Sequence, residues 1–111
     1  MKDDAVFLRH IRDAVEEIRR FTADGRDAFI ANRLVQAAVE RDLEIVGEAA
    51  KRVSEATRTA HPEVPWREMA GMRDVLIHGY HRVDLDAVWN TVERSLPPLL
   101  AVLDELLAES E

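Results

Sequence analysis

One long run of apolar side chains at helical spacing constrains the fold of this 111-residue chain more than any other feature. Between residues 32 and 59 the stripe is formed by Val35, Val39, Leu43, Val46, Ala50 and Val53. Steps of three and four place side chains on one face of an α-helix, whereas a half-buried strand needs steps of two. The stripe therefore predicts a long amphipathic helix over residues 32–59, with one face buried against other elements.

The segment before this helix has the same period. Asp3 or Asp4 can act as its N-cap, and the helix is expected to end near Gly25. Its predicted apolar face is formed by Val6, Ile11, Val15, Ile18 and Phe21. The stretch GRDAFIAN, which starts at Gly25, is expected to form a short connection to the long helix.

Prolines and an aspartate mark the helices of the second half. The prolines of HPEVP break the long helix and can start another, which spans residues 66–79 and can bend at Gly71. Asp84 stands at an N-cap position and begins the next helix. The buried face expected for this helix is formed by Leu85, Val88, Trp89, Val92 and Leu96. Pro97 and Pro98 then predict a kink or a break into a fifth helix.

The whole pattern is typical of an all-α protein. The sequence contains no credible strand, internal repeat or low-complexity tract. Helices joined by short connections predict an antiparallel four- to five-helix bundle. A length of 111 residues suits one domain with a real core, so residues 1–111 are assigned to a single helical domain.

Composition and charge narrow the classes of function. No apolar run approaches the roughly 18 residues of a membrane helix, and the first residues lack the apolar stretch of a signal peptide. Together with the absence of cysteine, this predicts a cytoplasmic protein that does not enter a membrane. The formal net charge of −7 has the wrong sign for a broad nucleic-acid-binding surface. A local cationic site can still bind a phosphate.

Metal and cofactor sites have little support in the sequence. The ferritin-like di-iron motif needs Glu three residues before His, and none of the 4 histidines has one. His78 and His81 are three residues apart, but Gly79 ends the helix between them and no cysteine completes a site. A Gly-rich phosphate loop and the Gly-x-Ser-x-Gly elbow of esterases are also absent. The sequence therefore predicts neither a metal nor a cofactor.

The stretch GMRDVLIHGYHRVD, residues 71–84, gathers the reactive side chains. Arg73 lies within the helix and His78 in its last turn, where Gly79 can adopt the left-handed conformation and turn the chain away. On an ideal helix the five-residue spacing turns the two side chains about 140° apart, so they do not share one narrow face. Because the chain turns away after His78, both side chains are expected to border one cleft at the helix end. Asp74, four residues before His78, can orient the imidazole.

This set of side chains suits phosphodiester cleavage in RNA. His78 can take a proton from a 2′-hydroxyl or give one to a leaving oxygen, and Arg73 can hold the phosphate without a metal. One histidine cannot easily be base and acid at once, and a two-fold dimer would bring a second Arg73 and His78 to the cleft. A purely structural alternative stays open. Arg73 would then pair with Asp74 or a neighbouring helix, His78 would be a helix-end cation, and Tyr80 would belong to the core.

Several residues together carry a resemblance to a known family. They are the motif residues Arg73, His78 and Tyr80, then Trp66, Gly71 and Met72 before them, and Val83, Asp84 and Trp89 after them. The stretch ERDLEIVGEAAKRVS, residues 40–54, is similar to the long second helix of the same family. From about residue 27 to residue 98, the chain resembles the HEPN superfamily and specifically the HepT-like toxins.

The resemblance implies an all-α HEPN-like bundle that forms a homodimer, with the Arg-x4-His motifs of both chains facing one cleft. It implies a toxin that cleaves RNA, with transfer RNA among the candidates, as a metal-independent endoribonuclease that leaves a 2′,3′-cyclic phosphate. Arg73 and His78 would be catalytic, and His81 and Arg82 lie close enough in sequence to touch the RNA. A cognate antitoxin with a minimal nucleotidyltransferase fold (MntA-like) would transfer AMP from ATP onto Tyr80.

The resemblance and the residues leave two questions open. Asp74 stands where many relatives carry asparagine, and it can orient the histidine or neutralise the arginine. Asp74 and the acidic net charge motivate a second hypothesis, a non-catalytic partner that regulates or scaffolds its nucleotidyltransferase. Gly47, Ala49 and Ala50 permit close helix approach, either across the dimer interface or internally against the first helix.

Overall fold

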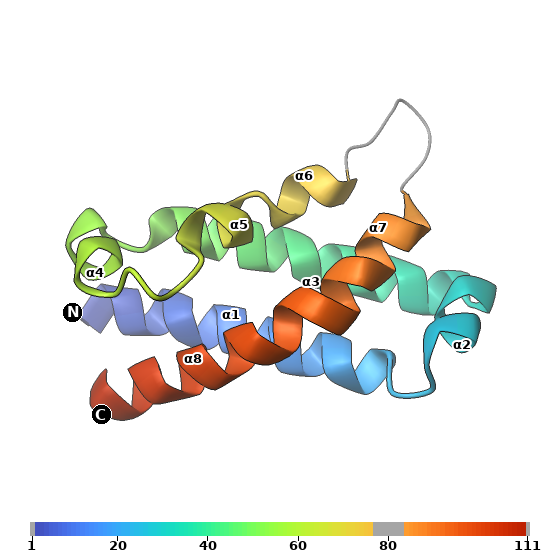
Figure 1. Ribbon diagram of the computed structural model, residues 1–111, viewed down its shortest axis with the longest axis horizontal. Coiled ribbons are helices and arrows are strands. Elements are labelled where there is room, and N and C mark those ends of the chain that lie inside the picture. The colour runs from blue at the N-terminus through green and yellow to red at the C-terminus, as the bar shows by residue number, and fades with distance from the viewer. Residues whose placement is uncertain (1, 77–83, 111) are drawn as a thin grey trace.

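The computed structural model describes residues 2–76 and 84–110, and within those ranges every regular element is a helix (Figure 1). The elements are α1 (Lys2–Phe21), α2 (Arg26–Ala31), α3 (Arg33–Arg52), α4 (Glu55–Ala60), α5 (Trp66–Ala70), α6 (Met72–Leu76), α7 (Leu85–Asn90), the π-helix η1 (Thr91–Ser95) and α8 (Leu96–Ser110). Helix α3 runs antiparallel to α1, the α5 and α6 segments run back along α3, and α7 to α8 reverse once more (Figure 1). The predicted all-α antiparallel bundle is therefore confirmed.

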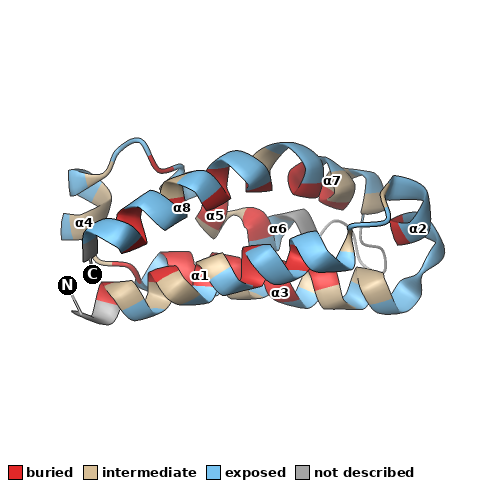
Figure 2. Cartoon of the chain, turned by 90° about the horizontal axis from the view of Figure 1, so that it is seen from below, coloured by how far each residue is buried: buried red, intermediate tan, exposed pale blue. Residues whose placement is uncertain are grey.

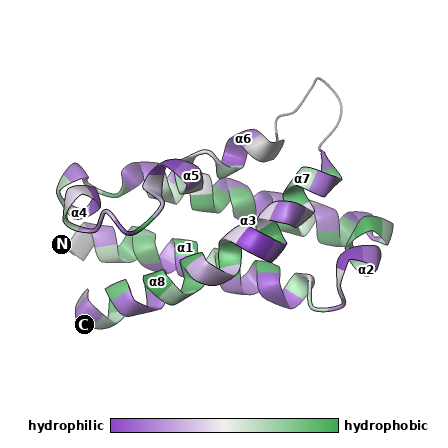
Figure 3. Cartoon of the chain, viewed as in Figure 1, coloured by the Kyte–Doolittle hydropathy of each residue, from purple (hydrophilic) through white to green (hydrophobic). Residues whose placement is uncertain are grey.

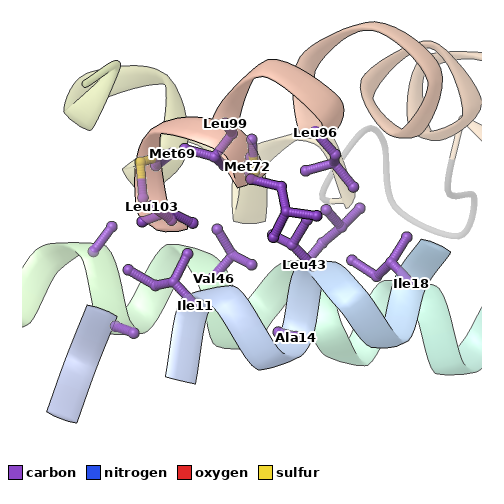
Figure 4. Close-up of a cluster of buried hydrophobic side chains, with 14 of the residues drawn as sticks. Ile11, Ala14, Ile18, Leu43, Val46, Met69, Met72, Leu96, Leu99 and Leu103 are labelled. Atoms are coloured by element: carbon purple, nitrogen blue, oxygen red, sulfur yellow. The ribbon is translucent and has the colours of Figure 1, made fainter. Parts of the chain in front are cut away.

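The hydrophobic core lies between the long helices. Helix α1 packs along α3 and against α8, and α3 packs against α5 and α6. The core side chains that meet there (Figure 4) include Ile11, Ile18, Leu43, Val46, Met69, Met72, Leu96, Leu99 and Leu103. Buried positions line the inward sides of α1 and α3 (Figure 2), and apolar and polar residues alternate around these helices (Figure 3). In the described part of the chain, no helix has the length and apolar character needed to cross a membrane.

The buried face of α1 differs from the prediction at its two ends. It is formed by Leu8, Ile11, Ala14, Val15 and Ile18. The prediction was wrong for Val6 and Phe21, which are each 39% exposed. Val6 lies five residues before Ile11, which turns it about 140° away from the buried side. Phe21 is the last residue of α1.

The predicted helix over residues 32–59 is divided in two by the structure. Asn32 caps its start, because its side chain accepts hydrogen bonds from the next helical turn. Helix α3 ends at Arg52, and the backbone of its C-cap residue Val53 is extended. Ser54 caps the start of α4 by accepting a hydrogen bond from the backbone N–H of Thr57. The apolar stripe continues to Val53, which is buried, so the break falls at the end of the stripe.

Asp4 lies within α1 and does not cap it, so the predicted cap is wrong. Its side chain instead stabilises the break between α3 and α4. Its buried carboxylate accepts hydrogen bonds from the Ser54 N–H at 2.9 Å and the Ser54 hydroxyl at 2.6 Å, and from the Thr57 hydroxyl. Burial acts to raise the pKa of Asp4, but these hydrogen bonds outweigh it and keep the pKa below its ordinary value. The ionised carboxylate thus connects the start of α1 to the start of α4.

The expected connection after Gly25 is the short helix α2. Gly25 has a φ of 93°, a value that favours glycine, and it precedes the first residue of α2. Phe29 is buried, and its ring lies 5.5 Å from that of Trp89 on α7. This aromatic contact packs α2 against α7. Sequence rules for short connections do not predict such a contact, because its two residues are far apart in the sequence.

The last helices follow the predicted signals. Asp84 caps α7 by accepting a hydrogen bond from the Ala87 N–H at 3.1 Å. Of the predicted face, Val88, Val92 and Leu96 are buried, and Leu85 and Trp89 are half-buried. A π-helical turn, η1, stands directly before α8, where Pro97 and Pro98 supply no N–H for the preceding carbonyl groups. The predicted break into a fifth helix is not found, because α8 follows η1 directly and includes both prolines, so the helical path continues (Figure 1).

Candidate functional site

Arg73 lies on α6, and a glycine on α3 sets its position. The predicted helix from Trp66 bends at Gly71, which separates α5 from α6. Gly47 of α3 is buried, and a Cβ atom placed there would lie 3.1 Å from the Cβ and 3.3 Å from the backbone N of Arg73. Because Gly47 has no side chain, α6 approaches α3 closely. Gly47 therefore packs internally against α5 and α6 rather than against the first helix.

The guanidinium of Arg73 pairs with Glu48, the residue next to Gly47. Its Nη1 donates a hydrogen bond to Oε1 of Glu48 at 2.8 Å, and the two side chains are 46% and 50% exposed. An ion pair as exposed as this contributes about 0–1 kcal/mol, so a phosphate can compete with Glu48 for the arginine. The structure thus places Arg73 against a neighbouring helix and leaves its guanidinium accessible.

A groove of about 700 Å³ lies over α3, between α1 and α6. Its polar lining comprises His10, Arg41, Glu44, Glu48, Arg52 and Arg73. Three arginines therefore face one groove in a chain whose net charge is −7. The groove is large enough for a nucleotide and presents the donors that phosphate oxygens require.

Sequence reasoning missed the other basic residues of this groove. His10, Arg41 and Arg52 look like a solvated helical surface, because charged residues at helical spacing are common there. The sequence signal that connects them to Arg73 is Gly47, which marks where α6 contacts α3. Without the tertiary contact, nothing local distinguishes Arg41 from other exposed arginines.

Asp74 is exposed on α6, and no ion pair between it and Arg73 is found in the described ranges. Its backbone N–H donates to the carbonyl of Gly71 at 2.8 Å. His78, Tyr80, His81 and Arg82 lie outside the described residues, since residues 77–83 are not among them. Their assignments remain predictions from the sequence.

A second polar feature, Asp42, lies on α3 beside the groove. Asp42 is 4% exposed, and its Oδ2 has no hydrogen-bond partner among the residues that the structure describes. Burial, followed by the hydrogen bond and negative charge of Glu17, raises the pKa of Asp42 to about 7. A hollow of about 420 Å³ beside Asp42 is also lined by His10, Asp13 and Glu17. Within the described residues, no three His, Cys, Asp or Glu side chains are arranged to hold a metal ion.

The fold and the groove define a class, the all-α helical bundles with an arginine-lined groove on their surface. Residues 11–106 match the family described as Ribonuclease HepT-like. A protein named "Probable ribonuclease HepT" from Thermococcus cleftensis is 43% identical over 101 residues, which cover 90% of this chain and 92% of that protein. The chain belongs to the HepT-like ribonuclease family.

Two further relatives extend the match to almost the whole chain. "Putative RNase MJ0125" from Methanocaldococcus jannaschii is 36% identical over 111 residues, 99% of this chain and 96% of that protein. "Putative RNase TTE0752" from Caldanaerobacter subterraneus subsp. tengcongensis is 36% identical over 112 residues, the full length of both. No solved structure matches the chain significantly. The resemblance noted in the sequence is confirmed at the level of the family.

Proposed function

We propose that this chain is the toxin of a toxin–antitoxin pair, a cytoplasmic and metal-independent endoribonuclease that leaves a 2′,3′-cyclic phosphate. One observation carries the proposal: Arg73, part of the Arg-x4-His motif, is half-exposed at a cationic groove in a member of a ribonuclease family. The names of the relatives support the RNase activity. Residues 1–111 are assigned to one HEPN-like helical domain in this proposal.

The reaction divides between two side chains. Arg73 exchanges its pairing with Glu48 for the scissile phosphate and stabilises the charge that develops on it. His78 accepts the proton of the 2′-hydroxyl, whose oxygen attacks phosphorus. The bond from phosphorus to the 5′-oxygen breaks, and that oxygen takes a proton from the protonated His78 of the second chain in the proposed homodimer. Asp74 orients His78 in this scheme.

Control of the site falls on Tyr80. A cognate nucleotidyltransferase antitoxin moves AMP from ATP onto the Tyr80 hydroxyl and releases pyrophosphate. The added phosphate lies in sequence close to Arg73 and His78, so its negative charge would repel RNA and its bulk would fill the cleft. His81 and Arg82 are proposed to contact RNA beside the same tyrosine.

The testing experiment is cleavage of bulk transfer RNA by the purified protein in EDTA, with mass spectrometry confirming unmodified Tyr80. The wild type is expected to produce cyclic phosphate ends, and R73A and H78A are each expected to lose cleavage while staying folded. Full cleavage by H78A would overturn the assigned mechanism. No cleavage by unmodified wild-type protein would overturn the proposed activity.

A second candidate is a non-catalytic partner of the nucleotidyltransferase. The observation in its favour is that Glu48 already neutralises Arg73, next to another carboxylate, Asp74, in a chain of net charge −7. In that case a complex with the Arg73/His78 double alanine variant would regulate growth as the wild type does. Loss of growth control in the double variant favours the ribonuclease.

A further inference from the structure

We infer that the groove over α3 binds a single-stranded stretch of RNA next to the cleaved bond, with phosphates on Arg41 and Arg52 and a base against Phe7 and His10. This inference rests on the proposed function and adds the form of the substrate and the residues that hold it.

The cations of the groove form a row along α3. Arg41 and Arg52 both line the groove and are eleven residues apart. At about 1.5 Å per residue, they are separated by about 16 Å along the helix axis. Arg73 meets α3 between them, at Glu48. Since a stacked strand advances about 3.4 Å per nucleotide, the row spans several phosphates.

The charges of the groove differ from those of the chain. Its lining has three arginines and two glutamates, whereas the chain as a whole is strongly acidic. Glu48 pairs with Arg73, and Glu44 lies 4.0 Å from Arg41. No ion pair of Arg52 is found within residues 2–76 and 84–110. The remaining positive charge is therefore local, and the acidic surroundings confine a polyanion to this groove.

Aromatic side chains on α1 complete the site. Phe7 and His10 both line the groove, and their rings lie 6.4 Å apart in an edge-to-face arrangement. Unpaired bases stack on aromatic rings, while bases in a duplex are not available for this contact. Cations in a row with aromatic rings beside them are typical of sites for single strands. The combination favours single-stranded over double-stranded RNA.

The test is binding of a fluorescent 2′-O-methyl oligoribonucleotide of about ten nucleotides, which lacks the attacking hydroxyl and is not cleaved. R41Q and R52Q are each expected to weaken binding several-fold and to reduce the slope of log affinity against log salt by about 0.7. R33Q is the matched control, because Arg33 is exposed on the same helix and does not line the groove. It should leave both quantities unchanged.

Two more variants distinguish a binding site from a structural role. E44Q removes a carboxylate that repels phosphate, so it should tighten binding, whereas a loosened fold would weaken it. F7L keeps an apolar side chain but removes the stacking surface, and it should weaken binding at least about five-fold. A duplex of the same sequence should bind more weakly than the single strand.

The outcomes separate this inference from the proposed function. Equal affinity of R41Q, R52Q and the wild type would overturn the inference. The inference would also be wrong if R41Q and R52Q shift the monomer–dimer equilibrium and leave the affinity for RNA unchanged. That result would mean that a second copy of the chain occupies the groove. If the wild type binds RNA through the groove but does not cleave RNA that has free 2′-hydroxyls, the proposed ribonuclease activity is wrong. The inferred binding site would then still be supported.

Discussion

At the scale of single residues, the position of Arg73 depends on Gly47, which has no side chain beyond a hydrogen atom. A Cβ atom at Gly47 would lie 3.1 Å from the Cβ of Arg73, tighter than ordinary contact, so α6 must move by a few tenths of an ångström. Alanine also gains about 1 kcal/mol of helix propensity, which offsets much of the packing strain. We expect G47A to change the free energy of unfolding little and to reduce RNA cleavage about ten-fold.

The matched control for Gly47 is G71A. A Cβ atom at Gly71 would lie 3.4 Å from the nearest atom, the carbonyl oxygen of Arg67, which is ordinary contact. Cleavage by G71A should stay within about two-fold of the wild type. Urea denaturation of both variants shows whether activity and stability separate. A G47A protein that cleaves RNA at the wild-type rate would show that α6 tolerates the displacement.

Asp42 makes the stability of the protein depend on pH. Its folded-state pKa is raised from the ordinary value of 3.8 to about 7, so between these values the unfolded chain is ionised while the folded chain still holds the proton. The free energy of unfolding therefore falls as pH rises from about 4 to about 7. D42N replaces the carboxyl group by a neutral amide and so removes this loss of stability. It should stabilise the protein by up to about 4 kcal/mol at pH 8 and hardly at all at pH 4.

Urea denaturation at the two pH values measures the Asp42 effect. E17Q is the companion variant, because the charge and hydrogen bond of Glu17 contribute to the raised pKa. It should reduce the pH dependence without abolishing it, since burial is the larger cause. An equal change in stability for D42N at pH 4 and pH 8 would contradict a raised pKa.

At the scale of elements, Asp4 joins α1 to the start of α4. Its carboxylate accepts two hydrogen bonds from Ser54 and one from Thr57. Hydrogen bonds to a charged group contribute about 1.5–3 kcal/mol each, and removal of the carboxylate also leaves the N–H of the half-buried Ser54 unpaired. We expect D4A to lower the free energy of unfolding by about 3 kcal/mol at pH 7.

The pH dependence of the Asp4 effect has a definite sign. The folded-state pKa is below the ordinary value of 3.8, so the stabilisation is present above about pH 4 and is lost as pH falls through the folded-state pKa. The difference between D4A and the wild type should therefore shrink in acid. D13A is the control on the same helix, where the Asp13 side chain is 70% exposed, and it should change stability by less than about 0.5 kcal/mol. A loss from D4A that stays the same in acid would contradict the role of the charge.

The elements show where sequence reasoning succeeds. The cap at Asp84 and the interruption at Gly71 follow from residues close by in the sequence, and the structure confirms them. The break at Ser54 was missed because its stabilising partner, Asp4, is fifty residues away in the sequence. Local rules identify signals that act locally, and they do not identify a helix end stabilised by a distant carboxylate.

The same distinction applies to the candidate site. Arg73 was identified from its motif, but its partner Glu48 and the other groove arginines were not, because the groove forms only when α6 packs on Gly47. Phe29 and Trp89 give a similar case, since the ring contact that fixes α2 joins residues sixty apart. Side chains within one helix turn were predictable, and contacts between helices were not.

At the scale of the whole molecule, the proposed mechanism requires two chains, because His78 of one chain acts as base while that of the other acts as acid. A dimer with one H78A chain would then lack one of the two proton-transfer groups and be inactive. When wild type and H78A are mixed in equal amounts and exchange freely, about one quarter of the dimers have two intact chains. Cleavage per total protein should fall to about one quarter of the value for wild type alone, and not to about one half. One half would mean that each chain works independently, and a purely monomeric protein in sedimentation at micromolar concentration would exclude the shared cleft.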